Sequence, residues 1–421
     1  MEQAIDISGK LKSKYAIAIY CLFAIIYIAI VGQRQGDFFI YLSASKDLFQ
    51  GKDIFSLTYI DGYHYYYSLL FAILIYPFNY LPLLASQYLW MLLNAFLMWR
   101  IVKILGSYFK LAQLPVKQQW IFFALCCIFS AKFTLANIYC QQITICILYL
   151  TLQGLEYIFS DKKIWGAVLI AFAINIKLLP IVILPYLLYR REFIASVAIL
   201  FAYATMLFLP VFIIGMSQNS FLLANWWRLI NPANDEHVMD VSQRGFHSLT
   251  SFLSVLLVDK PPDKYELHLK RNIANLSLSQ LSYVINIVRL GFVLFSFYFL
   301  RTRPFFNKVS KAHRYWEISY IFLITPLIFP HQQHYSFILA VPAMLHIFYY
   351  FLKNYKNMSK LKLRLIISAL TISFFTVNAT FLLGEFNAYY EHFKILTYGV
   401  LLLVPLLATF IPEMEVGENS A

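Results

Sequence analysis

The sequence predicts an all-α polytopic membrane protein, and two observations predict it: the composition and the recurrence of long apolar stretches. Of 421 residues, 60% are hydrophobic and 13% are charged, whereas soluble proteins carry about 25% charged residues. Apolar stretches of bilayer-spanning length recur between residues 15 and 410. We therefore expect a single membrane domain, residues 1–421, with about twelve transmembrane helices.

The first apolar stretch, residues 15–31, follows lysines at positions 10, 12 and 14. It is too long for a signal-peptide core and lacks a small-residue cleavage site, so we expect a retained helix with residues 1–14 in the cytoplasm. The five cysteines lie in or beside apolar segments, which favours neither a disulfide framework nor a metal site. The net charge of +13 comes from basic residues scattered between apolar runs. This scatter is typical of cytoplasmic loops near anionic lipid and does not indicate nucleic-acid binding.

The apolar runs can be divided into about twelve crossings in two ways. Taken at face value, they place the basic stretch 100–117 outside and leave Lys177 in mid-membrane, and both outcomes are unfavourable. We favour a partition in which residues 66–82, with their tyrosine-rich start, lie in the outer interface without crossing. In this partition residues 164–189 divide near Lys177, where Pro180 breaks the helix.

The favoured topology gathers polar groups at the outer face. Residues 33–83 and 216–280 form two outer loops, the first of them with interfacial helices, and residues 413–421 form a cytoplasmic tail. Because these outer segments come from distant parts of the chain, their meeting at one membrane surface indicates a site there. Four shorter elements are expected on the same face: residues 137–144, Lys177, residues 330–334 and residues 385–391.

The first outer loop begins with an amphipathic helix, predicted over residues 35–52 and expected to lie in the membrane interface. Asp37 stands at its start, directly after the first crossing. Two interpretations of Asp37 remain open: a helix cap that accepts hydrogen bonds from free backbone N–H groups, or a general base that takes a proton from a hydroxyl nucleophile. The predicted apolar face consists of Phe38, Tyr41, Leu42, Ser45, Leu48 and Phe49.

Four cationic or titratable side chains are expected at the same face, and each has a structural alternative. Lys177 lies between two apolar half-helices and needs either an anionic phosphate as partner or a path to the headgroups. Arg244 offers a planar fork suited to phosphate, or it forms a salt bridge within its loop. His331 and His334 can donate hydrogen bonds to a phosphate or a sugar, or they are interfacial loop residues. We discount a metal because no carboxylate motif completes a ligand set.

Several short motifs occur along the chain in a distinctive order. They are Asp37-Phe38 with Tyr41, Gly62 ahead of Tyr63 to Tyr67, Gln141-Gln142 at a helix entry, Lys177 to Pro180 as Lys-x-x-Pro, Gln243 in the large outer loop, and Pro330 followed by His331 and His334. Together this order resembles glycosyltransferase family 87, whose members have the GT-C fold. The resemblance covers about residues 15–345.

The resemblance implies a role for each matching residue. Asp37 falls on the catalytic acidic residue of the family. Tyr65 to Tyr67 stand where the family commonly has Tyr-Pro-Pro, and the tryptophan that usually precedes the paired histidines is missing. The residues implied to bind the donor phosphate are Lys177, Arg244, His331 and His334. Those implied to contact substrate are Tyr41, Gln141, Gln142 and Gln243.

The family includes polyprenyl-phosphate-dependent mannosyl- and arabinofuranosyltransferases that act outside the bacterial plasma membrane. The resemblance thus implies an inverting enzyme that moves mannose, or another hexose or pentose, from a polyprenyl-phosphate donor to a lipid or glycan acceptor, without metal or cofactor. Its expected partners are donor, acceptor and membrane lipids, with no nucleic acid. Two other classes stay open. A lipid or solute transporter or flippase predicts matched halves, which the sequence does not show, and an oligosaccharide ligase or polymerase predicts more arginines in the outer loop.

Overall fold

The computed structural model describes residues 20–231, 241, 244–260, 267–300, 304–305, 309–381 and 383–412, without the side chains of residues 61 and 381. Within these ranges every regular element is a helix, and the only β contacts are the isolated bridges Thr58–His64 and Phe246–Gln333. The prediction of an all-α chain is therefore confirmed.

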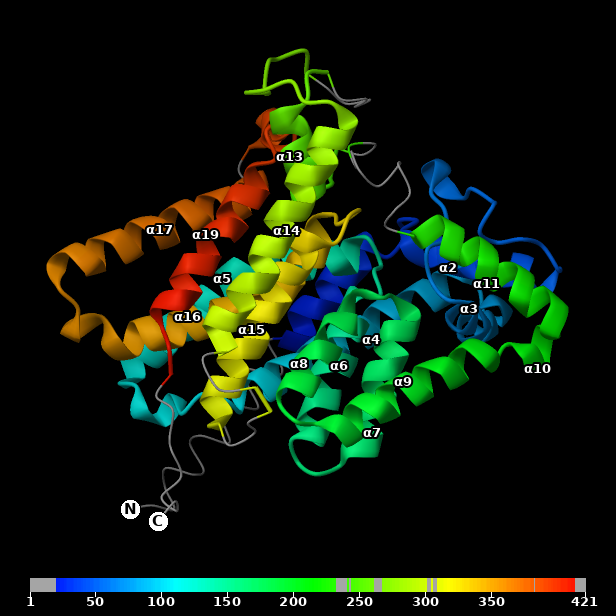
Figure 1. Cartoon of the computed structure of the whole chain (residues 1–421), viewed down its shortest axis with the longest axis horizontal. Coiled ribbons are helices and arrows are strands. Elements are labelled where there is room, and N and C mark those ends of the chain that lie inside the picture. The colour runs from blue at the N-terminus through cyan, green and yellow to red at the C-terminus, as the bar shows by residue number, and fades with distance from the viewer. Residues whose placement is uncertain are drawn as a thin grey trace.

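Most helices of the first half lie from the centre to the right of the view in Figure 1, away from α17. A helix over Tyr20–Val31 comes first. It is followed by α2 (Asp37–Phe49), α3 (Leu69–Ile75), α4 (Leu83–Gly106), α5 (Val116–Tyr139), α6 (Thr144–Ile158), α7 (Lys163–Ile176), α8 (Ile183–Tyr189) and α9 (Phe193–Phe208).

The helices of the second half complete the bundle, and α17 and α19 lie side by side at one edge of it (Figure 1). They are α10 (Val211–Ile214), α11 (Met216–Ile230), α13 (Leu249–Leu257), α14 (Leu278–Leu300), α15 (Lys311–Ile328), α16 (Val341–Asn354), α17 (Lys360–Asn378), α18 (Asn387–His392) and α19 (Ile395–Thr409).

Six helices of the described residues are long and apolar enough to cross a membrane, and a bent pair, 384–392 with 395–409, would make a seventh. Five further apolar helices have only 10–17 residues, which at about 1.5 Å per residue is shorter than a bilayer core of about 30 Å. The chain is thus membrane-embedded, but the predicted count of about twelve crossings is not confirmed. Among the short helices is Leu69–Tyr80, and the expectation that this stretch lies in the interface stays a prediction.

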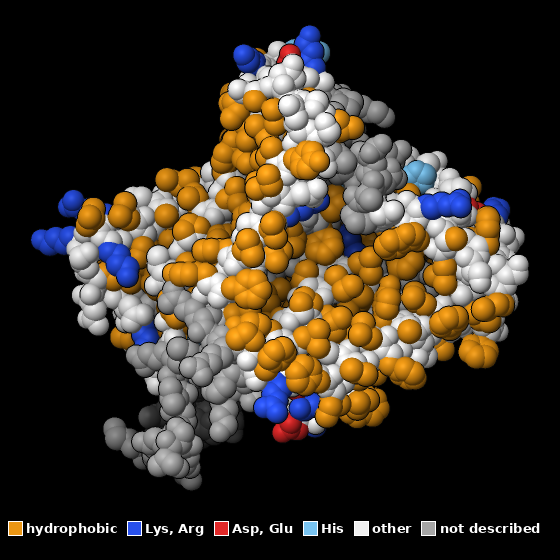
Figure 2. Space-filling view, in the orientation of Figure 1, with side chains coloured by type: hydrophobic (Ala, Val, Ile, Leu, Met, Phe, Trp, Pro, Cys, Tyr) orange, Lys and Arg blue, Asp and Glu red, His pale blue; other side chains and the backbone are white. Residues whose placement is uncertain are grey.

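The outer surface of the bundle is apolar over most of its height. Figure 2 shows hydrophobic side chains across the middle of one face and lysine and arginine side chains mainly at its edges. On α9, for example, Phe201 is 75% exposed and Val197 is 65% exposed. In water such a surface would drive aggregation, whereas in lipid it is the expected covering.

Close helix contacts in the interior depend on small residues. At the crossing of α6 and α7, a Cβ atom on Gly154 would lie 2.8 Å from the backbone oxygen of Gly166, and one on Gly166 would meet Gly154 in return. Between transmembrane helices, small residues allow the backbones to approach and gain packing energy that larger side chains would prevent. The two glycines therefore allow α6 and α7 to pack closely, and Lys177 directly follows α7.

The predicted break within residues 164–189 is confirmed. Helix α7 ends at Ile176, and Lys177 is extended, with φ −150° and ψ 130°. A 3₁₀ turn over Leu179–Val182 and then α8 follow. Proline disfavours a helical residue before it and donates no backbone hydrogen bond, so Pro180 explains why the helix cannot continue.

A buried ion network closes the other end of α8. The guanidinium of Arg190 donates to both carboxylate oxygens of Glu317 on α15, with its Nε 3.0 Å from Oε2. The Tyr186 hydroxyl donates to the same oxygen at 3.0 Å, and His313 Nε2 lies 3.2 Å from Oε1. Glu317 is only 1% exposed, so every cation and donor around it serves to compensate its buried charge.

Candidate active site

Asp37 lies in the first turn of α2, where the backbone packs closely against the end of α5. The N-cap of the helix is Gly36, and no side chain caps it, so the interpretation of Asp37 as a helix cap is wrong. The Asp37 amide donates to the Cys140 carbonyl at 2.9 Å, and a Cβ atom on Gly36 would lie 2.7 Å from that oxygen. Only glycine permits this approach, which fixes Asp37 next to the α5–α6 connection.

The Asp37 carboxylate accepts a hydrogen bond from the side-chain amide of Gln142. The amide oxygen of Gln142 in turn lies 3.4 Å from the hydroxyls of Tyr41 and Tyr67, which are 3.0 Å apart. Because an ionised carboxylate can only accept, the amide nitrogen faces Asp37 and the amide oxygen is left for the tyrosine hydroxyls. This chain of contacts orients the carboxylate from behind.

The buried face of α2 agrees largely with the sequence prediction. Five of the six side chains predicted for this face are buried. The sixth, Phe49, is 41% exposed, so the prediction is wrong for this residue. Phe49 is the last helical residue and stacks on Tyr76 at 3.8 Å between ring centroids. At the other end, Phe38 stacks on Trp90 of α4 at 4.8 Å. Aromatic packing thus holds the Asp37 end of α2 against the bundle.

Lys177 faces the same region from the break after α7. Its Nζ lies 6.0 Å from the centre of the Tyr67 ring, within the range of a cation–π interaction. The neighbouring turn is fixed because the Ser68 hydroxyl donates to the Asn175 side chain at 2.8 Å and caps α3. Asp37 and Lys177, separated in the chain by the six helices α2 to α7, therefore lie at one end of the bundle, and Tyr67 interacts with both of them.

The electrostatics of Asp37 are those of a partly desolvated carboxyl. Burial raises its pKa to about 6, although the hydrogen bond from Gln142 and the positive charge of Lys177 both lower it. Asp37 keeps some exposed surface, whereas Gln142 is fully buried. A carboxylate with a pKa near neutrality and an open side can act as a general base at physiological pH.

The two histidines of the 331–334 loop point to different neighbours. His331, with φ 54°, stacks on Tyr66 at 6.2 Å and meets the edge of Phe246 at 5.3 Å. His334 begins the 3₁₀ segment His334–Ala340 and interacts electrostatically with Lys132. The predicted pair thus divides between two neighbouring clusters.

The remaining predicted residues lie around these groups. The backbone oxygen of Arg244 accepts a hydrogen bond from Lys394 at 2.9 Å. Gln141 is fully buried, with φ 54°, and its side chain donates to the Arg34 carbonyl at 2.9 Å. Tyr41 and Gln142 are also fully buried, so substrate contact by these three residues stays a prediction. Gln243 lies outside the described residues.

Two titratable groups near the loop were not among the site residues predicted from the sequence, although residues 385–391 were expected at the same face. Lys132 of α5 is 5% exposed and donates to the Tyr390 hydroxyl at 3.0 Å. Glu391 of α18 lies 2.7 Å from His247 Nε2. A lysine within the apolar run 119–135 was a signal that could have revealed the first of them, because such residues are rare in membrane helices and usually functional.

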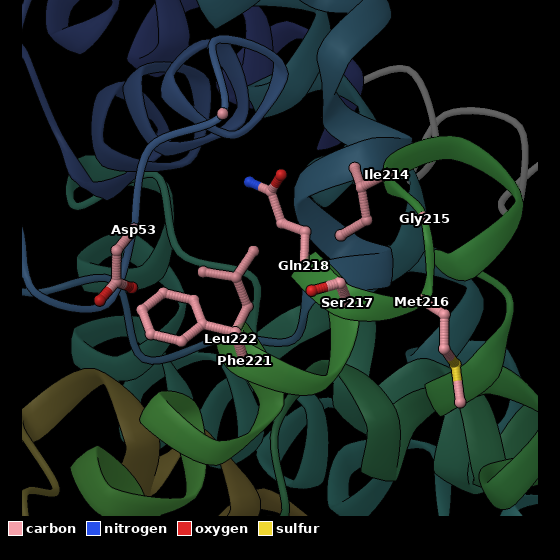
Figure 3. A pocket seen from close by; sticks show the side chains of 9 residues that line it. Asp53, Ile214, Gly215, Met216, Ser217, Gln218, Phe221 and Leu222 are labelled. Atoms are coloured by element: carbon pink, nitrogen blue, oxygen red, sulfur yellow. The ribbon is translucent and has the colours of Figure 1, made fainter.

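A cavity of about 490 Å³ opens elsewhere on the same side of the molecule, between the turn after α2 and the α10–α11 turn (Figure 3). Its walls include Asp53, Gly215 and Phe221. Asp53 is engaged there, because it accepts hydrogen bonds from the Asn225 side chain at 2.8 Å and the Phe55 amide at 3.1 Å. The cavity therefore lacks the open carboxylate that distinguishes the Asp37 region.

The model of glycosyltransferase family 87 matches residues 65–304, which is more than half of the chain. The chain belongs to glycosyltransferase family 87. The expected resemblance and the assignment as a glycosyltransferase are thereby confirmed. The matched part of this family 87 enzyme contains Gln142, Lys177 and Arg244, whereas Asp37 and both loop histidines lie outside it. A comparison with curated proteins finds no match.

Proposed function

We propose that this family 87 enzyme transfers a sugar from a polyprenyl-phosphate donor to a hydroxyl of a lipid or glycan acceptor, at the outer face of a bacterial plasma membrane, with inversion at the anomeric carbon. The observation that carries the proposal is the pairing of one partly exposed carboxylate, Asp37, with Lys177 at the same end of the bundle. A donor with its tail in the bilayer presents its phosphate and sugar at such an end.

Asp37 is the proposed general base. Its carboxylate takes the proton of the acceptor hydroxyl while the hydroxyl oxygen attacks the anomeric carbon. Gln142 donates to Asp37 and keeps the carboxylate in position as it becomes a carboxylic acid. The hydrogen bond from an amide favours the ionised form, so Asp37 stays ready to accept a proton near neutral pH.

Lys177 is the proposed partner of the leaving phosphate. The bond between the anomeric carbon and the phosphate oxygen breaks, and the oxygen retains the electron pair. The positive charge of Lys177, with Arg244 and the histidines 331 and 334, stabilises the developing negative charge. Attack from the side opposite the phosphate gives a single displacement and therefore inverts the configuration.

The replacement Asp37→Asn tests this mechanism. We expect transfer of radiolabelled sugar from a polyprenyl-monophosphate donor by the purified enzyme to fall by a factor of about 10²–10⁴, with the melting temperature retained. The matched control is Asp47→Asn, on the same helix, because Asp47 forms an ion pair with exposed Lys52 at 2.7 Å and has no role in the proposed reaction. Full turnover by Asp37→Asn would remove Asp37 from the role of base.

The donor class is tested separately. The purified enzyme is given the same sugar as a polyprenyl monophosphate or as part of a diphosphate-linked glycan. Transfer from the monophosphate alone supports the proposal. Transfer from the diphosphate-linked glycan alone would assign the enzyme to oligosaccharide ligation or polymerisation instead.

A further inference from the structure

A small polar cavity lies at the other end of the bundle from Asp37, where the ends of α4 and α6 meet the start of α15. Its volume is about 90 Å³, and it is lined by Tyr108, Glu156, Phe159, Ser160, Lys311 and Arg314. Helix α6 begins close to Gln142, the partner of Asp37, and ends beside the cavity. Its 15 residues extend over about 22 Å. The cavity is therefore separate from the proposed transfer site and shares no residue with it.

Two charged side chains at this cavity are paired with each other. The Lys311 Nζ lies 3.8 Å from a carboxylate oxygen of Glu156 and donates to the Ser107 hydroxyl at 3.3 Å. It also lies 4.5 Å from the centre of the Tyr108 ring, and the Tyr108 hydroxyl donates to Glu156. One carboxylate thus balances one lysine, and neighbouring groups hold both of them at the wall of the cavity.

Arg314, one turn further along α15, forms no ion pair within the described part of the chain. Its guanidinium carbon lies 4.6 Å from the centre of the Phe159 ring, and its Nε atom is buried without a hydrogen-bond partner. A buried donor without an acceptor is unfavourable, and the planar guanidinium matches the oxygens of a phosphate. Residues three apart share one face of a helix, so Lys311 and Arg314 line the cavity together.

The position of the cavity along α4 is that of a lipid headgroup. Helix α4, Leu83–Gly106, is one of the helices long and apolar enough to cross a membrane, and Tyr108 follows its end directly. On the last turns of α4, Val102 is 50% exposed, so apolar surface suited to lipid tails reaches almost to the cavity. The positive end of the α15 dipole lies here as well, because this helix begins at Lys311. Positive charge thus gathers where the apolar layer ends.

We propose that this cavity binds the phosphate group of an anionic membrane lipid, in the leaflet opposite to the proposed transfer site. The guanidinium of Arg314 and the ammonium of Lys311 donate to the phosphate oxygens, while Glu156 keeps Lys311 in position. Basic pockets between transmembrane helices on the cytoplasmic side bind acidic headgroups, and the favoured topology predicts that side for residues 100–117. The bound lipid connects α4, α6 and α15. The proposal does not depend on the proposed sugar transfer.

The test measures lipid binding without sugar transfer. Phosphatidylglycerol, or phosphatidylcholine with the same acyl chains, is titrated against the full-length enzyme in a non-ionic detergent, with the melting temperature as the readout. A ligand that binds the folded state raises the melting temperature as its concentration increases. We expect a saturable rise with phosphatidylglycerol and a much smaller one with the zwitterionic lipid. Arg314→Gln should weaken phosphatidylglycerol binding about tenfold or more, because it removes the cation without a counter-ion.

The matched control is Lys103→Gln, which removes one positive charge at the same end of the bundle. Lys103 lies on the last turn of α4, outside the cavity, with its Nζ 3.9 Å from the centre of the Trp99 ring. This variant should bind phosphatidylglycerol as the wild type does. Equal weakening by Lys103→Gln and Arg314→Gln would overturn the proposal, because the lipid would then respond only to the general charge of this face.

A second variant and a second ligand complete the test. The Lys311 side chain is 52% exposed, so Lys311→Gln tests the same cavity even where Arg314→Gln does not fold. We expect it to weaken phosphatidylglycerol binding about threefold to tenfold, and unchanged binding would overturn the proposal. Inorganic phosphate at the same concentration separates a lipid headgroup from a free anion. A weaker effect of inorganic phosphate supports the lipid, whereas an equal effect would overturn the assignment to a lipid.

Discussion

Asp37 and Glu317 are both carboxylates inside the bundle, yet their surroundings differ in kind. Glu317 receives two bonds from Arg190, one from Tyr186 and a contact from His313, which leaves none of its capacity unused. Asp37 accepts a side-chain hydrogen bond from Gln142, and Lys177 acts on it only through a longer-range electrostatic interaction. A saturated buried ion pair holds helices together, whereas a carboxylate with a free side can do chemistry.

The largest expected effect is on stability at the saturated carboxylate. Glu317→Ala leaves Arg190 buried without its partner, so we expect the free energy of unfolding to fall by about 3–5 kcal/mol, measured by thermal or denaturant unfolding in detergent. Replacing both partners with apolar residues, as in Arg190→Met with Glu317→Leu, should recover much of that loss. Wild-type unfolding of Glu317→Ala would show that the network does not hold α8 to α15.

At Asp37 the ionised carboxylate lowers the stability of the fold, which is the opposite of the contribution expected at Glu317. The folded pKa of Asp37, about 6, exceeds the ordinary value of 3.8, so the folded state binds the proton more tightly and loses stability as the pH rises from about 4 to about 6. Asp37→Asn should therefore melt no lower than the wild type at pH 7 while losing transfer. A destabilised Asp37→Asn would mean that the carboxylate supports the fold, as Glu317 does.

The pH dependence of transfer gives the next effect. A general base must be ionised, so the rate of transfer at saturating substrate should fall about tenfold for each pH unit below the Asp37 pKa of about 6. The measurement is a pH profile of initial rates between pH 4.5 and 8. A profile without an acid limb in this range would separate the reaction from Asp37.

The smallest expected effect is a shift of the pH profile when Gln142, the hydrogen-bond donor to Asp37, is replaced. Because the hydrogen bond from Gln142 lowers the pKa of Asp37, Gln142→Met should move the acid limb of the same profile upward by about one pH unit. At pH 8 its rate should stay within about tenfold of the wild type, since Asp37 is ionised there. An unmoved limb would show that Gln142 does not set the acidity of Asp37.

Local features of this fold were predictable, and long-range pairings were not. The break at Lys177 follows from Pro180 three residues later, and the buried face of α2 follows from helical periodicity. The bond between Gln142 and Asp37 joins residues 105 apart, and that between Lys132 and Tyr390 joins residues 258 apart. No local pattern encodes such partners, because they depend on how separate helices pack.

The number of crossings was the least predictable feature for a related reason. Composition identifies apolar runs, but short helices such as α7 and α8 have the same composition as long ones. Composition therefore does not show which runs cross the membrane. Where a run divides is decided by single residues and by the neighbours that satisfy its broken backbone. The resemblance to the family was found instead from the order of the motifs along the chain. That order does not depend on the number of membrane crossings.

The extended backbone at Lys177 has a consequence for the resting enzyme. Helix α7 ends there, and Pro180 has no N–H to offer the Ile176 carbonyl, so the last carbonyls of α7 keep their negative partial charge. That helix end attracts the ammonium group that follows it. A lysine steadied by a backbone dipole needs no permanent carboxylate at its side. Among the described residues Asp37 forms no ion pair with Lys177, although the charge of Lys177 lowers the pKa of Asp37, so in the proposed reaction the carboxylate can still accept a proton from the incoming hydroxyl.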